Sequence, residues 1–299
     1  MNVVDLFCGC GGMSLGFQKG GYSIKAAYDN WVPAIEMYKR NFHHPVINMD
    51  LFSEDAVESI QKYEPEMIIG GPPCQDFSIA GARKMGKRAN LTKRYAEIVS
   101  AIKPEWFVME NVYNIERMPI LPVALKMLKD AGYGITTVIL DASRCGCPQK
   151  RKRFFAIGHL GDQDDFLKDI LLRNQDEHQM TVREYWENVL KLKIDTDYYY
   201  MHPRSYNRRA VFSIDEPSAT IRGVNRPIPS DYKPHHADKA DVAAGNVRAL
   251  TSKERSYIQT FPKDYVWVGN KTNIELAIGN AVPVNLATYV ANAITEYEE

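Results

Sequence analysis

Short apolar runs alternate with stretches of helical periodicity over the first 160 residues of the chain. The apolar runs predict buried strands at residues 3–7, 23–28, 67–69, 106–109, 136–140 and 153–157. The stretches between them predict helices, most clearly at residues 13–19, 32–41, 95–102 and 121–131. Alternation of this kind is typical of an α/β fold with a doubly wound, mostly parallel sheet.

The pattern loosens after this region and becomes helical again near the carboxyl end. The looser part contains the aromatic cluster Tyr198-Tyr199-Tyr200 and proline-rich turns around Pro227 and Pro229. The last segment, 281–297, again repeats apolar residues at helical spacing. We therefore expect a first domain at residues 1–164, a smaller second domain at 165–270 and a carboxyl-terminal segment at 271–299.

Composition sets limits on the class of protein. With 299 residues and 45% hydrophobic content, the chain can bury a large core. The amino terminus has no basic region before an apolar stretch, and no run has the length expected of a bilayer span. We expect neither a signal peptide nor a membrane segment, and a cytoplasmic location.

Cysteine usage argues against a disulfide framework and against a metal site. Five cysteines are an odd number for a chain of this size. The spacings Cys8-x-Cys10 and Cys145-x-Cys147 are tighter than the usual zinc pattern, and the seven histidines supply no second half of a site. We expect no bound metal.

Charge is balanced in total but uneven along the chain. Lys+Arg and Asp+Glu both number 37, so the formal net charge is zero. Residues 83–94 are nevertheless basic without a single acid, whereas acids concentrate at 162–197. A charge run is usually a solvated face. Because this run contains Gly86, has Gly81 just before it and follows Cys74 closely, it also fits a mobile loop that closes over a phosphate backbone.

A cysteine and a glutamate follow two neighbouring apolar runs. Cys74 stands in Pro72-Pro73-Cys74-Gln75, where the two prolines cannot extend the preceding strand. Glu110 ends the run that starts at Trp106. Each residue alone is most often structural, a small buried hydrophobe or a solvated charge. Together at strand ends, where open α/β sheets carry their chemistry, they predict a nucleophile and an acid in one pocket.

A glycine-rich turn links the first strand to the first helix, as in nucleotide-type cofactor loops, although packing alone can also require such a turn. With the other motifs it makes the chain resemble the DNA (cytosine-5)-methyltransferase family over about the first 160 and last 50 residues. The motifs occur in this order: Phe7-x-Gly9-x-Gly11-Gly12, Pro72-Pro73-Cys74-Gln75, Glu110-Asn111-Val112, Gln149-x-Arg151-x-Arg153 and Ile278-Gly279-Asn280-Ala281-Val282-Pro283.

The resemblance implies a Rossmann-like catalytic domain of the class I S-adenosyl-L-methionine-dependent type, a target-recognition domain, and a carboxyl-terminal segment that returns to the first domain. It implies methylation of carbon 5 of a flipped-out cytosine in a specific short duplex DNA sequence. Carbon 5 is a poor nucleophile, so a thiolate must first add to carbon 6. A protonated carboxyl group must then give a proton or a strong hydrogen bond to ring nitrogen N3. The implied catalytic residues are Cys74, Gln75, Glu110, Asn111, Arg151 and Arg153, with the two arginines on the base oxygen and a phosphate.

The same resemblance implies where the methyl donor and the DNA bind. Phe7 would lie against adenine, Asp29 would hold the ribose hydroxyls and Asp50 the adenine amino group. The full implied cofactor set is Phe7, Gly9, Cys10, Gly11, Gly12, Asp29, Asn30, Asp50, Leu51, Pro73, Asn280 and Ala281. The candidate DNA contacts are Ser78, Arg83, Lys84, Lys87, Arg88, Arg204, Arg208, Arg209, Arg222 and Arg226.

Two other functions compete with DNA methylation. A transfer RNA cytosine-5 methyltransferase would keep the chemistry, but that branch carries a Cys-Phe-Thr signature, and no cysteine follows Cys147 here. A non-catalytic nucleic-acid-binding relative would be expected to have lost one of the site residues. The chain looks like a bacterial or phage-type modification enzyme that acts as a monomer, with a restriction endonuclease of the same specificity as a candidate partner.

Overall fold

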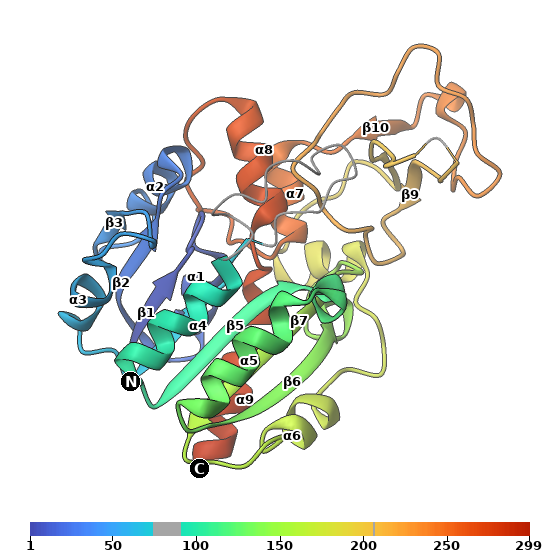
Figure 1. Ribbon diagram of the computed structural model, residues 1–299. Helices are drawn as coiled ribbons and strands as arrows, with labels where there is room; N and C mark the ends of the chain where they lie inside the picture. Colours follow the sequence, from blue (N-terminus) through green and yellow to red (C-terminus); the bar gives the residue numbers. More distant parts are fainter. Residues whose placement is uncertain (74–90, 206) are drawn as a thin grey trace. The chain divides into compact units, whose positions relative to one another are not determined.

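Seven strands form the main sheet, in the order β3-β2-β1-β4-β5-β7-β6 (Figure 1). The computed structural model describes residues 1–73, 91–205 and 207–299. The strands are β1 Asn2–Leu6, β2 Ser23–Asp29, β3 Val46–Asn48, β4 Met67–Gly70, β5 Trp106–Val112, β6 Tyr133–Asp141 and β7 Lys152–Leu160. Pairs β1–β2, β1–β4, β2–β3 and β4–β5 are parallel, and β5–β7 is antiparallel. The carboxyl ends of β1 to β5 therefore share one edge of the sheet.

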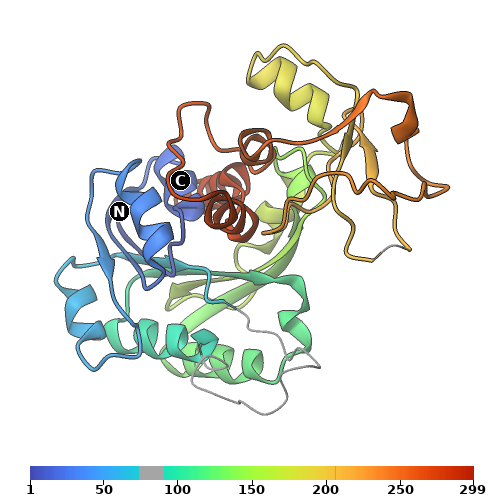
Figure 2. The ribbon, with the colours of Figure 1, turned by 90° about the horizontal axis from the view of Figure 1, so that it is seen from above.

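Helices cover both faces of this sheet (Figure 2). One layer contains α3 Ala56–Gln61, α4 Leu91–Ile102 and α5 Ile120–Asp130, and the other contains α1 Gly12–Lys19, α2 Val32–Lys39 and α9 Val284–Glu298. In the second layer the Thr288 hydroxyl of α9 donates to the Gly16 carbonyl of α1 at 3.0 Å. Burial from both sides explains why the strands read as continuous apolar runs rather than as alternating patterns.

The chain divides into two compact units. The first unit comprises Met1–Leu140, Lys152–Gln175 and Ala287–Glu299, and the second comprises Asp141–Arg151 and Asp176–Leu286. These boundaries differ from the expected divisions at 164 and 270, since residues 141–151 and 271–286 fall in the second unit. The side chain of Arg151 accounts for part of the difference, because it bonds to carbonyls of Ile221, Gly279 and Ala281.

The second unit has a small sheet of its own, in the order β10-β8-β9. Its strands are β8 Tyr198–Tyr200, β9 Val211–Ser213 and β10 Val247–Ala249, and its helices include α7 Ser252–Ile258 and α8 Lys271–Asn280. Tyr199 and Phe212 stack across β8 and β9 with ring centroids 5.9 Å apart. A buried cluster of Trp186, Ile214, Leu250 and Ile278 with their neighbours forms the core. The expected aromatic cluster is thus the central strand of this unit.

The sheet confirms the predicted α/β class, and each predicted strand is present. The sequence did not predict β3, α3, α7 or α8. Shorter elements are α6 Lys168–Arg173, the 3-10 turns η2 Tyr113–Arg117, η3 Ala142–Arg144 and η5 Val242–Ala244, and the π-type turn η4 Glu184–Val189.

One stretch, residues 271–298, has the length and mean hydropathy (1.2) of a membrane-spanning helix. Of its most apolar window, 61% is buried inside the protein, and core helices pass the same test. The stretch is also divided, because α8 ends at Asn280 and α9 begins at Val284, after Pro283. The apolar residues of this stretch are therefore explained by packing inside the protein.

Candidate active site

Glu110 and Arg153 form an ion pair where β5 and β7 meet. In the antiparallel register Arg153 lies opposite Val112, so Glu110, two residues earlier, lies diagonally across from it on the same face. Arg153 Nε lies 2.8 Å from Glu110 Oε1, and the side chains are only 12% and 10% exposed. Burial lowers the pKa of Arg153, while the charge of Glu110 and the hydrogen bond to it act in the opposite direction. The pair is a fixed, largely desolvated charge couple at a strand end.

The segment that leaves the neighbouring strand β4 is bonded to Asn111, the residue after Glu110. Asn111 Nδ2 donates to the Pro72 carbonyl at 2.9 Å, and Asn111 Oδ1 accepts from the Val112 amide at 2.9 Å. A Cβ atom placed on Gly71 would lie 3.2 Å from Glu110 Oε2. The chain leaving β4 therefore runs directly past the Glu110 carboxylate before it reaches Pro73.

The glycine-rich turn after β1 adopts a backbone that favours glycine. Phe7, Gly9 and Gly11 have φ values of 59°, 53° and 88°. A Cβ on Gly11 would lie 2.4 Å from the Phe42 ring, so a larger residue would displace that ring. A Cβ on Gly9 would meet nothing within 4 Å among the described residues. The turn therefore offers open space at Gly9 and close packing at Gly11.

Asp29 holds this turn from the end of β2. Its carboxylate accepts hydrogen bonds from the amides of Gly9 and Trp31, both at 2.8 Å. Burial raises the pKa of Asp29, and the bonds from the Trp31, Gly9 and Asn30 amides oppose that shift. Asp50, after β3, is exposed, whereas the adjacent Leu51 is buried. Phe7 and Leu51 come shortly after β1 and β3, Asp29 ends β2 and Glu110 lies near the end of β5, so these four residues are placed toward one edge of the sheet.

The cysteines in the described part of the chain have the properties of inert thiols. Cys8, Cys10, Cys145 and Cys147 are all buried. Burial raises the pKa of each, to about 12 for Cys10 and Cys147. The remaining predicted residues of the loop lie outside the described residues; they are Cys74, Gln75, Ser78, Arg83, Lys84, Lys87 and Arg88.

Arg151 has a different use from the expected contact with base or phosphate. It belongs to the second unit, is 1% exposed, and donates to the carbonyls of Ile221, Gly279 and Ala281 at 2.8–3.1 Å. Nearby, the buried Gln149 side chain accepts from the Ile221 amide at 2.8 Å. Arg151 is therefore an internal brace. Asn280, exposed, and Ala281 also belong to this unit, whereas the other predicted cofactor residues belong to the first unit.

Four arginines of the second unit form a group that we call the arginine cluster. They are Arg204, Arg208, Arg222 and Arg226, of which all but Arg222 are exposed. Burial lowers the pKa of Arg222, and the charges of Arg204 and Arg208 add to the shift. None of the four forms an ion pair with a residue in the described part of the chain. The cluster is thus a concentration of positive charge that an anion could neutralise.

Arg209 differs from the arginine cluster. Its guanidinium makes two hydrogen bonds to Glu216, at 2.7 and 2.8 Å, and lies 4.4 Å from the centre of the Phe212 ring. This bidentate pair and ring contact stabilise the second unit. Arg209, a candidate DNA contact, therefore has two partners within the second unit.

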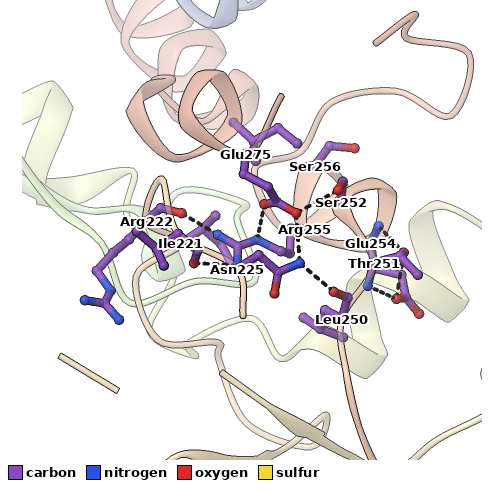
Figure 3. Close-up of polar contacts among 12 residues, drawn as sticks. Ile221, Arg222, Asn225, Leu250, Thr251, Ser252, Glu254, Arg255, Ser256 and Glu275 are labelled. Atoms are coloured by element: carbon purple, nitrogen blue, oxygen red, sulfur yellow. Dashed lines mark hydrogen bonds and ion pairs between the residues drawn. The ribbon is translucent and has the colours of Figure 1, made fainter. Parts of the chain in front are cut away.

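A buried network beside Arg222 fixes the backbone of residues 222–225 (Figure 3). Arg255 and Glu275 are each 2% exposed and pair through Nε and Oε2 at 2.9 Å. Arg255 donates to the carbonyls of Arg222 and Val224, the latter at 3.0 Å. Glu275 Oε1 accepts from Asn225 Nδ2 at 2.8 Å and from the Ser252 hydroxyl at 2.7 Å. Figure 3 shows the Arg222 side chain pointing away from this network.

Sequence reasoning missed several residues that build these sites. Arg255 and Glu275 stand in polar surroundings that read as solvated helix, and no local pattern distinguishes a buried charge there. Asp5 and Ser14 form a buried hydrogen bond of 2.5 Å beneath the glycine-rich turn. Asp5 could have been found, because a carboxylate inside an apolar strand is unusual and needs a partner.

Comparisons with known proteins agree with one another. The family model described as C-5 cytosine-specific DNA methylase matches residues 1–296. The chain is 55% identical over 301 residues to the Type II methyltransferase M.HindV of Haemophilus influenzae, covering 100% of this chain and 98% of that protein. It is 53% identical over 299 residues to the Type II methyltransferase M.HgiDI of Herpetosiphon aurantiacus, covering 99% and 95%. The solved structure of S. pombe Dnmt2 methyltransferase has the same fold, with a TM-score of 0.76, 19% identity, and coverage of 99% and 98%.

Proposed function

Because the chain belongs to the C-5 cytosine-specific DNA methylase family, it uses S-adenosyl-L-methionine to methylate carbon 5 of cytosine in DNA, and we propose that Cys74 and Glu110 perform the chemistry. The observation that carries this assignment is the Glu110–Arg153 ion pair of 2.8 Å beside Gly71 and Pro72. It places a fixed carboxylate next to the segment that leads directly into Cys74.

The chemistry divides between two strand ends. The Cys74 thiolate adds to carbon 6 of cytosine, which makes carbon 5 nucleophilic. Glu110, protonated when the base is bound, donates to ring nitrogen N3. Arg153, whose Nε lies 2.8 Å from Glu110 Oε1, holds the carboxyl group in position and is the candidate for contact with the base oxygen. After methyl transfer, carbon 5 loses its proton and the thiol leaves, which restores the aromatic ring. Asn111 orders the site by holding the Pro72 carbonyl.

The other cysteines support Cys74 by elimination. A thiol attacks as its thiolate, so a raised pKa makes a cysteine unreactive. Burial raises the pKa of all four described cysteines. Cys74 is the one cysteine that stands in the motif expected of the nucleophile.

The edge of the sheet around the glycine-rich turn fits the methyl donor. When bound, the donor supplies an electrophilic methyl group on a positively charged sulfur. Gly9 leaves space where a side chain would project, and Asp29 lies at the end of β2, the usual place for a carboxylate that binds ribose hydroxyls. The Oδ1 atom of buried Asp5 has no hydrogen-bond partner in the described part of the chain. We assign donor binding to Phe7, Gly9, Gly11, Gly12, Asp29, Asp50 and Leu51 at this edge.

The second unit supplies target recognition. The arginine cluster has no acidic partner among the described residues, so DNA phosphates would relieve its mutual repulsion. The network of Arg255 and Glu275 holds the backbone on both sides of Gly223. Arg222 and Arg226 belong to this held segment or follow it directly, and they are candidates for base or phosphate contacts. Extrusion of the target cytosine costs roughly a few kcal/mol, which contacts of this kind must offset.

The Type II names of the relatives indicate a restriction–modification role. We propose that the enzyme acts in the bacterial cytoplasm, as a monomer, on the same duplex sequence that a partner endonuclease cleaves. Methylation of that sequence would protect the host DNA.

Methyl transfer from labelled S-adenosyl-L-methionine tests the assignment, with duplex DNA and transfer RNA as separate substrates. We expect label in duplex DNA, none in transfer RNA, and complete loss with Cys74→Ser. Cys145→Ala, which removes a buried thiol, is the matched control and should retain activity. Full activity of Cys74→Ser would overturn the nucleophile, and label confined to transfer RNA would overturn the substrate.

A further inference from the structure

A fully buried carboxylate ties the two ends of the glycine-rich turn together. Asp5, in β1, is 0% exposed, and its Oδ2 atom accepts a hydrogen bond from the Ser14 hydroxyl of α1 at 2.5 Å. The connection spans the turn from Phe7 to Gly12, so Asp5 fixes the start of α1 relative to β1.

From Asp5 a chain of hydroxyl groups leads to a histidine. The Tyr38 hydroxyl donates to Ser14 Oγ at 2.6 Å and lies 2.6 Å from His44 Nε2. Ser14 and Tyr38 are 0% exposed, whereas His44 is partly exposed. Four side chains from β1, α1, α2 and the segment after α2 thus form one continuous path from the buried carboxylate to the surface.

The surroundings of Asp5 favour its neutral form. Burial raises the pKa of Asp5 to about 7, Asp29 adds to the shift, and the Ser14 hydrogen bonds oppose it. Cys8 of the turn and Tyr95 of α4 are the other titratable groups in electrostatic contact with Asp5. Neither they nor Asp29 can supply a positive charge. At the far end, burial lowers the pKa of His44 to about 4, and His43 adds to that shift.

We propose that Asp5 is a positioning residue for the methyl donor that gives up a proton when the donor binds, and that Ser14, Tyr38 and His44 carry this proton to solvent. This inference rests on the proposed placement of the donor at the glycine-rich turn. The donor brings a sulfonium and an ammonium group, and a nearby positive charge favours an ionised carboxylate. The carboxylate in turn holds α1 and the turn in the binding geometry.

The transfer balances in protons and charge. When Asp5 is neutral, the hydrogen bonds run from Asp5 to Ser14, from Ser14 to Tyr38 and from Tyr38 to His44 Nε2; the opposite directions, in which Ser14 donates to Asp5 and Tyr38 donates to Ser14, belong to ionised Asp5. From the neutral state, the Asp5 proton moves to Ser14 Oγ as the Ser14 proton moves to Tyr38 Oη and the Tyr38 proton moves to His44 Nε2. His44, now doubly protonated, releases its Nδ1 proton to water. The products are ionised Asp5 and neutral His44, and every hydroxyl in the path is restored with its hydrogen bonds reversed in direction.

Titration calorimetry tests the coupling without measuring catalysis. Binding of S-adenosyl-L-methionine at pH 7 is measured in two buffers of different ionisation enthalpy, for the wild type and Asp5→Asn. We expect the wild type to release about half a proton more than the variant. Wild-type affinity should also fall by up to about tenfold per pH unit below pH 7, and the variant should lack this added dependence. Equal proton release by the two proteins would overturn the role of Asp5.

Tyr38→Phe tests the path, because it removes one hydroxyl and keeps the ring. In stopped-flow mixing with a pH indicator, we expect proton release to coincide with donor binding in the wild type and to lag behind it in Tyr38→Phe. Tyr22→Phe, whose hydroxyl contacts Thr295 instead, is the control and should behave as the wild type. Prompt release by Tyr38→Phe would place the path elsewhere. A wild type that binds no donor would instead refute the proposed cofactor site.

Discussion

The two units each contain an arginine–glutamate pair of nearly the same length, and the two pairs do different work. Arg153 and Glu110 lie 2.8 Å apart with side chains 12% and 10% exposed, while Arg255 and Glu275 lie 2.9 Å apart and are 2% and 3% exposed. The first pair stands at a strand end, and Arg153 also donates to the Lys152 carbonyl. The second pair bonds to two carbonyls, an amide side chain and a hydroxyl.

The difference teaches how surroundings determine the use of an ion pair. A buried pair whose partners are all internal holds backbone in place, because any loss leaves a charge unpaired. A pair at the edge of the sheet still meets solvent or substrate, so its charge is available for chemistry. Mutations of the two pairs should therefore separate activity from stability.

The largest effect is expected from Glu110→Gln. Because we propose that Glu110 donates to ring nitrogen N3, its loss should lower kcat by roughly 10²- to 10⁴-fold, the usual range for general acid–base catalysis. The melting temperature should change little, since glutamine can still bond to Arg153. Methyl transfer to DNA and thermal unfolding are measured on the same preparation. Glu275→Gln is the matched variant, and a similar loss of kcat there with unchanged stability would break the comparison.

Arg255→Met should lower the free energy of unfolding by about 3–5 kcal/mol, because Glu275 is left as a buried, uncompensated charge. The double variant Arg255→Met with Glu275→Leu removes both charges and should recover much of this loss. It should not recover normal DNA affinity, because the Arg222 and Val224 carbonyls remain without their donor. Denaturant unfolding and DNA binding distinguish these effects. A double variant no more stable than the single one would contradict the account.

The contrast between the pairs also marks what the sequence could predict. Glu110 was predictable, because it ends an apolar run and its motif has a fixed order with the others. Arg153 was predicted to bind the base, but its pairing with Glu110 depends on the β5–β7 register, which comes from two strands distant in sequence. Arg255 and Glu275 could not be predicted, since their burial comes from tertiary contacts with residues 222–225.

Asp5 offers a third buried carboxylate, one with no cation in electrostatic contact within the described part of the chain. Its pKa is raised by burial to about 7, from a usual value of 3.8. Between pH 3.8 and about pH 7, Asp5 therefore keeps its proton in the native state but has lost it in the unfolded state. The contribution of Asp5 to stability is greatest at low pH and should fall by up to about 1.4 kcal/mol per unit as pH rises from 4 to 7.

Asp5→Asn should remove this contribution. We expect the variant to gain stability relative to the wild type as pH rises from 4 to 7, with a constant difference above that range. Thermal unfolding across the range measures it, and Asp164→Asn, at an exposed carboxylate, is the control. Parallel stability curves for Asp5→Asn and the wild type would show that folding does not raise the pKa of Asp5, and would contradict this account.

Arg222→Ala tests what the Arg255–Glu275 pair positions. If Arg222 contacts a base, its loss should cost about 1–3 kcal/mol of binding and relax specificity at one position; if it contacts phosphate, the salt slope should fall by about 1. These outcomes are separated by measuring binding to a duplex that contains the enzyme's target sequence and to unrelated duplexes, over a range of salt concentrations. Arg209→Ala is the control, because its guanidinium is engaged by Glu216. Unchanged DNA affinity in Arg222→Ala would contradict the proposal that the Arg255–Glu275 network positions Arg222 for DNA binding.

The smallest effect is expected at the start of α7, the helix that carries Arg255. Thr251 caps this helix in a capping box with Glu254, in which each side chain bonds to the backbone of the other. Thr251→Ala should lower the free energy of unfolding by about 1 kcal/mol, and Thr251→Ser should retain most of the cap. Because the cap orients α7, the alanine variant should weaken DNA binding slightly while kcat at saturating DNA stays unchanged. A fall in kcat instead would mean that α7 influences the Glu110–Arg153 pair, so that the two ion pairs do not act independently.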